Sequence, residues 1–408
     1  MAEELPRGAV KSMDRRLYWR RYGRWIALGQ SGFPFAIGPF PTPVSHFRAM
    51  ARRTRFARRA GGLAARLVMM LAWPFGAFFA ALRSWSRLRE KGGPPQGPRS
   101  LLDMYWLALR HSIPPTDYAL YRLSDPAHRR DLHHFVCSND LPGLAVLAAR
   151  AGADHRDVQD KDRFAQICSA HGLPHVETLA AFQAGRQTRP VQPFVPELPV
   201  LWTKARHLKG GAGGAAWTRD GAVYRDAAGR RLSPAELAVS LHQWDCIVQP
   251  YIGNHPAMTG LSNGALAALR VVTGMNERGE GEFVTSLLAL PHGAKTTSVA
   301  GILCSIEPDS GHIRRAMMPD GEQVARHPDS GEPVVGVALP FWFESVALAR
   351  RAHAGAFPRF PFLGWDIALT ADGPLLLEAN MCWGAIFHQM LDGPLGHTVF
   401  SRLVARHL

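Results

Sequence analysis

The stretch that decides the fold is GWDIALTADGPLLLEANMCWG, residues 364–384. It reads as a strand, a turn at Ala371-Asp372-Gly373 and a second strand, which together predict an antiparallel hairpin. If those three residues form the loop, Asp366 lies opposite Glu378, and Asn380 shares their face. A two-residue turn at Asp372-Gly373 would instead put the two carboxylates on opposite faces.

Two carboxylates and an amide on one face, among apolar neighbours, are costly to bury unless a cation neutralises them. A magnesium ion held by one or two carboxylates together with substrate phosphates is such a cation. We therefore interpret Asp366, Glu378 and Asn380 as metal ligands. The alternative is an exposed hairpin whose acids are solvated by water.

A second stretch with the character of an anion site is WTKARHLKGGAGGAAW, residues 202–217. Lys204 ends an apolar strand, and the loop that follows contains Gly210, Gly211, Gly213 and Gly214. Glycines let backbone N–H groups approach phosphate oxygens, and a lysine supplies a point charge. The stretch matches neither GxxxxGK[ST] nor GxGxxG, so a flexible surface loop is an equal alternative.

Two further strands carry polar residues in apolar surroundings. In DCIVQPYI, residues 245–252, the Gln249 side chain is placed to meet an adenine edge, with Ile252 packing on the ring; the alternative is an ordinary strand end. Arg270 lies inside the apolar strand LRVVT. Buried arginines are rare unless paired with an anion, so we expect it to contact a phosphate or, alternatively, to form a structural salt bridge.

The rest of the chain predicts a mixed fold. Residues 101–150 and 160–172 have helical patterns, and the later part has short apolar runs separated by Gly, Asp and Asn turns. The predicted strands are 200–203, 222–225, 246–248, 268–273, 283–288, 364–369 and 375–378. The fold class is therefore α+β, behind a mainly helical entry.

The charge of the chain is concentrated at its start. Of 47 Lys+Arg and 33 Asp+Glu in 408 residues, residues 1–99 hold 19 and 4, so the remainder is close to neutral. This lack of a basic stripe in the larger part argues against a nucleic-acid partner. Five scattered cysteines without a CxxC pair indicate neither zinc nor disulfides, and they fit a reducing, cytoplasmic setting.

The basic front combines arginines, tryptophans and one apolar run, Leu67 to Leu82. As a helix that run would reach about 24 Å, short of the ~30 Å hydrocarbon core, and Pro74 and Gly76 are expected to break it midway. We therefore expect residues 15–91 to bind an anionic membrane surface peripherally, at the inner face. The alternatives are a packed helical hairpin with a solvated basic rim and an oligomer contact.

The order of these motifs resembles the ATP-grasp superfamily over roughly residues 155–405. That order is Asp160-Lys161, Lys204 with the glycine loop, Gln249, Arg270, Asp366 and Glu378-x-Asn380. The stretches NHPAMTGLSNGALAALRVVT and LGWDIALTADGPLLLEAN are similar to the sugar-transfer-associated branch, which is also described as alpha-L-glutamate ligase-related. One departure is KTTSVAG at residues 295–301, where the branch commonly has an Asp-Asn pair before a double glycine.

The resemblance implies two α+β subdomains that grip ATP, and a role for each candidate residue. Lys161 and Lys204 would contact the phosphates, and Gly210, Gly211, Gly213 and Gly214 would close over them. Gln249, Tyr251 and Ile252 would hold adenine. Asp366, Glu378 and Asn380 would bind Mg²⁺, as two ions. Arg270 would hold the transferred phosphoryl group or the acyl phosphate, and the Gly384 N–H would face the developing oxyanion.

The function implied is an ATP- and magnesium-dependent ligase that joins a carboxylate, activated as an acyl phosphate, to an amine. A small-molecule or glycan-precursor substrate in polysaccharide or cell-surface synthesis fits this family. The alternatives are a phosphotransferase to a hydroxyl and a membrane-tethered ATP-binding protein without turnover. The corresponding regions are a basic front (1–99), a helical entry (100–155) and an ATP-grasp domain (156–408).

Overall fold

The computed structural model describes residues 27–29, 40–59, 62–90, 97–208, 213–262, 264–293 and 301–408. The chain divides into two compact units, residues 1–146 with 384–408 and residues 147–383. We call the first the helical unit and the second the sheet unit. The domain boundaries predicted from the sequence do not group the last 25 residues with the first part of the chain.

The helical unit holds short and long helices and no described strand. Its helices are α3 (Pro43–Arg59), α4 (Leu63–Glu90), α5 (Pro98–His111), α6 (Pro115–Leu120), α7 (Pro126–Arg130), α13 (Ala385–Asp392), η2 (Leu395–His397) and α14 (Val399–Ala405). The chain passes to the sheet unit within α8 (Pro142–Arg150). The core of this unit packs around Met104, Leu107, Tyr118 and Tyr121.

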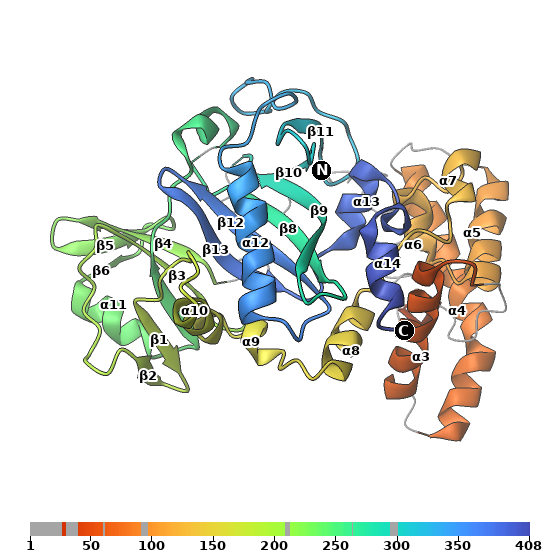
Figure 1. The fold of residues 1–408 in the computed structure, drawn as a ribbon, viewed down its shortest axis with the longest axis horizontal. Coiled ribbons are helices and arrows are strands. Elements are labelled where there is room, and N and C mark those ends of the chain that lie inside the picture. The colour runs from red at the N-terminus through yellow and green to blue at the C-terminus, as the bar shows by residue number, and fades with distance from the viewer. Residues whose placement is uncertain are drawn as a thin grey trace, which may run out of the picture. The chain divides into compact units, whose positions relative to one another are not determined.

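The sheet unit contains two antiparallel sheets (Figure 1). The seven-stranded sheet has the order β2-β1-β7-β3-β4-β5-β6, and the six-stranded sheet has the order β11-β10-β9-β8-β12-β13. The strands are β1 (Ala180–Gln183), β2 (Arg186–Arg189), β3 (Val200–Ala205), β4 (Ala215–Asp220), β5 (Val223–Asp226), β6 (Arg231–Leu232), β7 (Cys246–Pro250), β8 (Ala268–Met275), β9 (Gly281–Leu290), β10 (Ile302–Ile306), β11 (Ile313–Met317), β12 (Phe362–Thr370) and β13 (Gly373–Asn380).

The helices of the sheet unit are α9 (Arg156–Gln159), α10 (Lys161–Ala170), α11 (Pro234–Leu241), η1 (Pro256–Leu261) and α12 (Trp342–Ala356). Helix α12 packs on β8, β9 and β12, and α11 packs on β5 and β6 (Figure 1). The α+β class is thereby confirmed, as are all seven predicted strands. The strands that the sequence missed are short or polar, such as β2 with the sequence RQTR, and carry little apolar alternation.

In the β12–β13 hairpin Asp366 and Glu378 lie opposite each other as predicted, but the loop and the register that bring this about differ from the prediction. Thr370 pairs with Gly373, so the loop has two residues, Ala371 and Asp372, and the predicted three-residue loop is wrong. Such a loop alone would place Leu377 opposite Asp366. A β-bulge shifts the register between Asp366 and Ile367, however, so that Glu378 pairs with Asp366 after all.

Helix α4 also corrects an expectation, because it runs unbroken through Pro74 and Gly76. Pro74 removes one backbone hydrogen bond, but the helix buries Trp73 and Ala77 against its neighbours, and this packing holds it together. The backbone of Gly29 lies so close to Gly76 that a Cβ on Gly29 would be 2.1 Å from the Gly76 oxygen. Among the described residues, α4 is the one helix long and apolar enough to cross a membrane, with a mean hydropathy of 1.6 over 18 residues.

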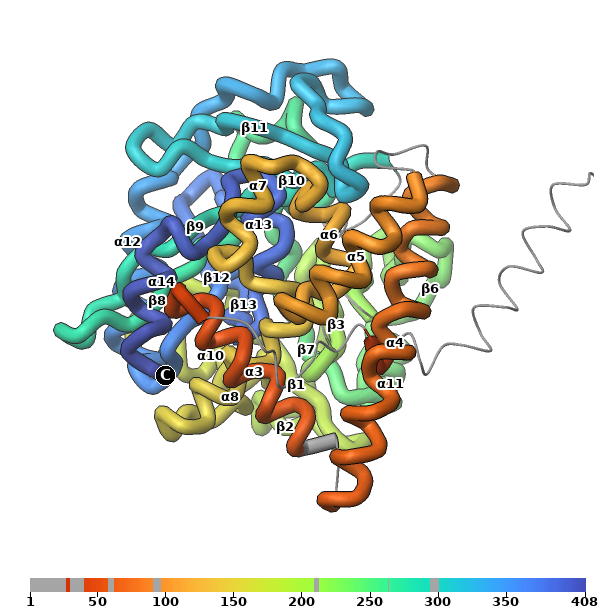
Figure 2. Tube along the Cα trace, turned by 90° about the vertical axis from the view of Figure 1, so that its right-hand side faces the viewer, coloured from red at the N-terminus to blue at the C-terminus, as the bar shows by residue number. Residues whose placement is uncertain are grey.

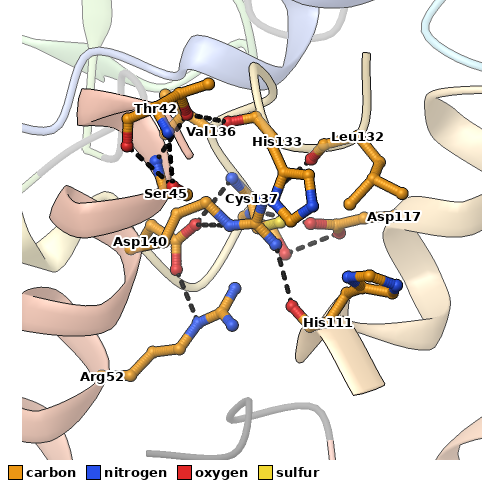
Figure 3. A network of polar contacts seen from close by, with 12 residues as sticks. Thr42, Ser45, Arg52, His111, Asp117, Leu132, His133, Val136, Cys137 and Asp140 are labelled. Carbon is orange, nitrogen blue, oxygen red and sulfur yellow. Dashed lines mark hydrogen bonds and ion pairs between the residues drawn. The ribbon is translucent and has the colours of Figure 1, made fainter. Parts of the chain in front are cut away.

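A buried polar network ties α3 to the chain between α7 and α8 (Figure 3). Asp140, with no exposed surface, accepts hydrogen bonds from Arg52 Nε at 3.0 Å and from the Cys137 backbone N–H at 2.8 Å. Arg48 Nε lies 3.5 Å from the same carboxylate. Asp140 therefore places one negative charge between two buried guanidinium groups.

Replacing Asp140 with Ala is expected to destabilise the helical unit by about 3–5 kcal/mol, because it leaves buried guanidinium charge uncompensated. Urea unfolding followed by circular dichroism measures the effect. Asp154→Ala is the matched control, since it removes a carboxylate that pairs with the exposed Arg156. Equal free energies of unfolding for the two variants would contradict this assignment.

A second buried chain of hydrogen bonds lies between α12 and the six-stranded sheet. Trp365 Nε1 donates to Thr273 Oγ1 at 2.8 Å, Thr273 Oγ1 lies 2.7 Å from His353 Nδ1, and His353 Nε2 lies 2.7 Å from the Phe360 carbonyl oxygen. The neutral imidazole with its proton on Nε2 satisfies all three contacts. Burial lowers the pKa of His353 to about 4.

Because the unfolded chain binds a proton at His353 near pH 6.5 and the folded chain does so only near pH 4, stability should fall as the pH drops through this window. His353→Gln keeps a donor for the Phe360 carbonyl and removes the titration. Between pH 7 and pH 5 the wild type should lose about 2 kcal/mol more than this variant, at 1.36 kcal/mol per pKa unit. Identical losses in urea unfolding would show that His353 does not titrate in this way.

Candidate functional site

A row of charged side chains crosses three neighbouring strands of the six-stranded sheet. Arg270 on β8 pairs with Asp366 on β12, which pairs in turn with Glu378 on β13. The guanidinium of Arg270 donates from Nε and Nη2 to the two Asp366 oxygens, at 2.6 and 2.7 Å. Its Nη1 donates to the Trp383 carbonyl at 3.1 Å. The structural salt bridge is thus present, and contact with a phosphate stays a prediction.

Asn380 joins this row on the same face. Its Nδ2 lies 3.3 Å from Asp366 Oδ2 and 3.2 Å from Glu378 Oε1, so the amide bridges the two carboxylates. Rotating the amide by 180° would present its oxygen instead. The structure therefore brings together the three residues that the sequence predicts as metal ligands.

Two lysines approach this row from other elements of the sheet unit. Lys161, the first residue of α10, places Nζ 3.8 Å from Glu378 Oε2 and 2.6 Å from the Leu208 carbonyl oxygen. Lys204 lies on β3, where Leu201, Thr203 and Ala205 are buried on the opposite face. The strand alternation thus turns Lys204 away from the core of the seven-stranded sheet.

The position of Lys161 is fixed by a pair that the sequence reasoning missed. Asp160 caps α10 by accepting from the Asp162 N–H at 3.0 Å, and it pairs with Arg206 at 2.8 Å through both guanidinium nitrogens Nε and Nη2. The Lys161 N–H donates to the Arg206 carbonyl at 3.2 Å. The sequence offered two signs of this pair: Asp160 stands at the N-cap of the predicted helix, and Arg206 follows Lys204 by two positions.

A cavity of about 140 Å³ opens beside the carboxylates. It is lined by both polar and apolar side chains: Val158, Gln159, Lys161, His207, Leu208, Glu378, Ala379, Asn380 and Met381. Sequence reasoning missed Gln159 and His207, although His207 follows Lys204 by three residues. The cavity thus brings a lysine, a histidine, a carboxylate and an amide to one hollow.

Burial and neighbouring charge shift the pKa values of this group. Burial, with Lys161 adding to it and Glu378 opposing it, lowers the pKa of Lys204 to about 8. Burial opposes ionisation of Glu378, but Lys204 and Lys161 outweigh it and lower its pKa. Burial raises the pKa of Asp366, helped by Glu378 and opposed by Arg270. Fully ionised, the cluster holds three cations and two carboxylates, which favours a polyanionic ligand.

The donor set fits a magnesium ion that is completed by a ligand. Among the described residues, no group of three or more His, Cys, Asp or Glu side chains could hold a metal ion. Asp366, Glu378 and the Asn380 oxygen supply hard oxygen donors, and Mg²⁺ typically takes one or two carboxylates with water and phosphate. The two neighbouring carboxylates, one of them paired with Arg270, therefore suit a magnesium ion that is bound together with phosphates.

The side chain of Gln249 makes a hydrogen bond within the sheet unit. It is buried in β7, and its Nε2 donates to the Val176 carbonyl at 3.3 Å. The Val176 N–H donates to the Leu376 carbonyl on β13 at 3.1 Å. Gln249 thus supports the segment that joins the two sheets. The half-exposed Tyr251 donates its hydroxyl to the Gly264 carbonyl at 3.0 Å, and adenine contacts by Gln249, Tyr251 and Ile252 stay predictions.

The predicted glycines fall in three places. Gly210 and Gly211 lie outside the described residues, while Gly213 and Gly214 lead into β4, Gly213 with φ 73° and close to Trp244. Gly384 caps α13 with φ 79° and belongs to the helical unit. Its contact with an oxyanion, like the closure of the glycine loop, stays a prediction.

Comparisons with a family model and with solved structures both found similar proteins. The model of the sugar-transfer associated ATP-grasp family matches residues 150–403. Among solved structures, N5-carboxyaminoimidazole ribonucleotide synthetase in complex with ADP shows 12% identity and a TM-score of 0.34, over 60% of this chain and 51% of that one. D-alanine–D-alanine ligase from Helicobacter pylori shows 11% identity and a TM-score of 0.35, over 62% and 61%.

This chain therefore spans only 51% and 61% of the lengths of those two structures. The ATP-grasp ligase PsnB, solved with a minimal precursor, shows 15% identity and a TM-score of 0.30, over 64% of this chain and 67% of that one. No curated protein matches the sequence. Because the family model covers more than half of the chain, including the whole charged row, the protein belongs to the sugar-transfer associated ATP-grasp family.

Proposed function

We propose that the sheet unit binds ATP with Mg²⁺ and uses it to activate a carboxylate for attack by an amine. The observation that carries this proposal is the row of Arg270, Asp366, Glu378 and Asn380. Lys161 lies beside this row, and Lys204 is close enough for the two carboxylates to affect its pKa. Phosphoryl transfer mainly requires positioning and neutralisation of charge, and these residues supply both.

In the first step, an oxygen of the substrate carboxylate attacks the γ-phosphorus of ATP. The bond from that phosphorus to the β,γ-bridging oxygen breaks, which gives an acyl phosphate and ADP. Bound Mg²⁺ would be held by Asp366, Glu378 and Asn380 and would neutralise phosphate charge. Lys161 and Lys204 would contact the phosphates, and Arg270 would orient the transferred group from beside Asp366.

In the second step, the amine attacks the acyl carbon, and phosphate leaves with the electrons of the carbon–oxygen bond. The amine nitrogen loses a proton and an amide is formed. We propose a small-molecule or glycan precursor in polysaccharide or cell-surface synthesis as the substrate, which the family description supports. A cytoplasmic location follows from the need for ATP.

The products decide between this reaction and transfer of phosphate to a hydroxyl. Purified full-length protein would be incubated with ATP, Mg²⁺ and a pool of amino acids and nucleotide sugars, followed by mass spectrometry. The ligase releases inorganic phosphate together with ADP and forms an amide. Release of ADP without inorganic phosphate, together with a phosphorylated product, would instead identify a phosphotransferase.

Glu378→Gln keeps the shape of the side chain and removes its charge, so ADP formation should fall by about 100-fold or more through loss of metal and phosphate positioning. A coupled ADP assay measures the rate at saturating ATP. Asp372→Asn is the matched control in the exposed turn of the same hairpin and should retain activity. Unchanged activity in Glu378→Gln would refute the assignment of this carboxylate.

Lys204 should take up protons when ATP binds near pH 8, because it is about half charged in the free protein and a triphosphate raises its pKa. Titration calorimetry at pH 8 in two buffers of different ionisation enthalpy measures this uptake. The wild type should take up roughly half a proton more than Lys204→Met, which should also bind ATP at least about tenfold more weakly. Equal uptake in both proteins would contradict a phosphate contact by Lys204.

A further inference from the structure

Helix α4 of the helical unit carries an apolar stripe whose side chains are largely exposed. Leu63, Leu67, Leu71, Phe75 and Phe78 follow one another at steps of four or three residues, so they lie on one side of the helix. Leu71 is 76% exposed and Phe75 is 64% exposed. Single exposed leucines are ordinary, but a run of this length along one helix face is not.

A neighbouring helix extends this surface. On α5, Leu102 and Trp106 are four residues apart and 65% and 58% exposed. Figure 2 shows α4 and α5 side by side, and the rings of Phe78 and Tyr105 meet edge to face at 5.8 Å. Leu102 and Trp106 therefore lie on the helix that packs beside α4. We call the two exposed sets together the α4–α5 face.

Helices α4 and α5 carry an excess of positive charge. The two helices contain six arginines, at positions 66, 83, 87, 89, 99 and 110, against two acids, Glu90 and Asp103. Asp103 is itself paired with Arg129. Residues 1–99 as a whole hold 19 Lys/Arg against 4 Asp/Glu. This charge complements an anionic lipid surface, where each cation contributes on the order of 1 kcal/mol.

The opposite side of α4 argues against insertion of the helix across a bilayer. Trp73, Ala77 and Ala108 form a buried cluster between α4 and α5, and Ala81 joins the main core of the helical unit. Its neighbours carry charge, since α5 holds Asp103 and α6 holds the buried Asp117. Spanning would require these groups to enter hydrocarbon, whereas lying in the interface requires only that the exposed stripe enter it.

We propose that the α4–α5 face binds the surface of an anionic membrane, with α4 lying in the plane of the interface. The stripe from Leu63 to Phe78 is about 22 Å long, at 1.5 Å per residue. Leucine and phenylalanine side chains enter the boundary between headgroups and acyl chains, and the flanking arginines meet the lipid phosphates. This proposal concerns the helical unit and does not depend on the reaction of the sheet unit.

The test uses the full chain and sedimentation with vesicles of phosphatidylcholine, with or without phosphatidylglycerol. Leu71→Gln with Phe75→Gln should weaken binding to the anionic vesicles by about tenfold or more, which corresponds to about 1.4 kcal/mol. Val191→Gln with Val239→Gln is the matched control, because both valines are exposed in the sheet unit, at 98% and 65%. This control should bind as the wild type does.

High salt should reduce binding of the wild type toward its level on neutral vesicles. Circular dichroism and ADP formation in the absence of vesicles should be the same in the α4 variant and the wild type. The proposal is overturned if the wild type does not bind anionic vesicles, or if both double variants lose binding equally. It is also overturned if light scattering shows an oligomer that the α4 variant alone dissociates, since a second copy would then cover this face.

Discussion

The architecture of the sheet unit depends on holding two carboxylates next to each other in a largely buried place. Asp366 and Glu378 repel one another, and burial opposes their ionisation. Arg270 pairs with the first, while Lys161 and Lys204 stabilise the charge of the second. The cations come from one strand of each sheet and from α10, so the arrangement exists only when both sheets are assembled. Folding and the capacity to bind a polyanion are therefore coupled in this unit.

Short polar contacts around the charged row hold its side chains in position. Asp160 and Arg206 fix the start of α10 and hence Lys161, and Asn380 links the two carboxylates. The helical unit uses a related arrangement, in which Asp140 pairs with buried arginines of α3. Buried charge thus contributes to cohesion in the helical unit, and in the proposed function it also prepares the sheet unit for a ligand.

The sequence predicted much of this through local patterns. The strands around Arg270, Asp366 and Glu378 follow from apolar alternation, and the shared face of the two carboxylates was predicted correctly. The reason given for it was wrong, because a β-bulge rather than a three-residue loop sets the register. Bulges depend on packing across several strands, which a local pattern does not encode. The continuity of α4 through Pro74 likewise depends on tertiary burial, and the Asp160–Arg206 pair joins residues 46 positions apart.

The backbone of Val176 links the two sheets of the sheet unit. Its N–H is bonded to β13 at the edge of one sheet, and its carbonyl receives the buried Gln249 of the other. Val176 therefore connects the two sheets through its own backbone, and a motion that separated the sheets at this point would have to break one of these two bonds.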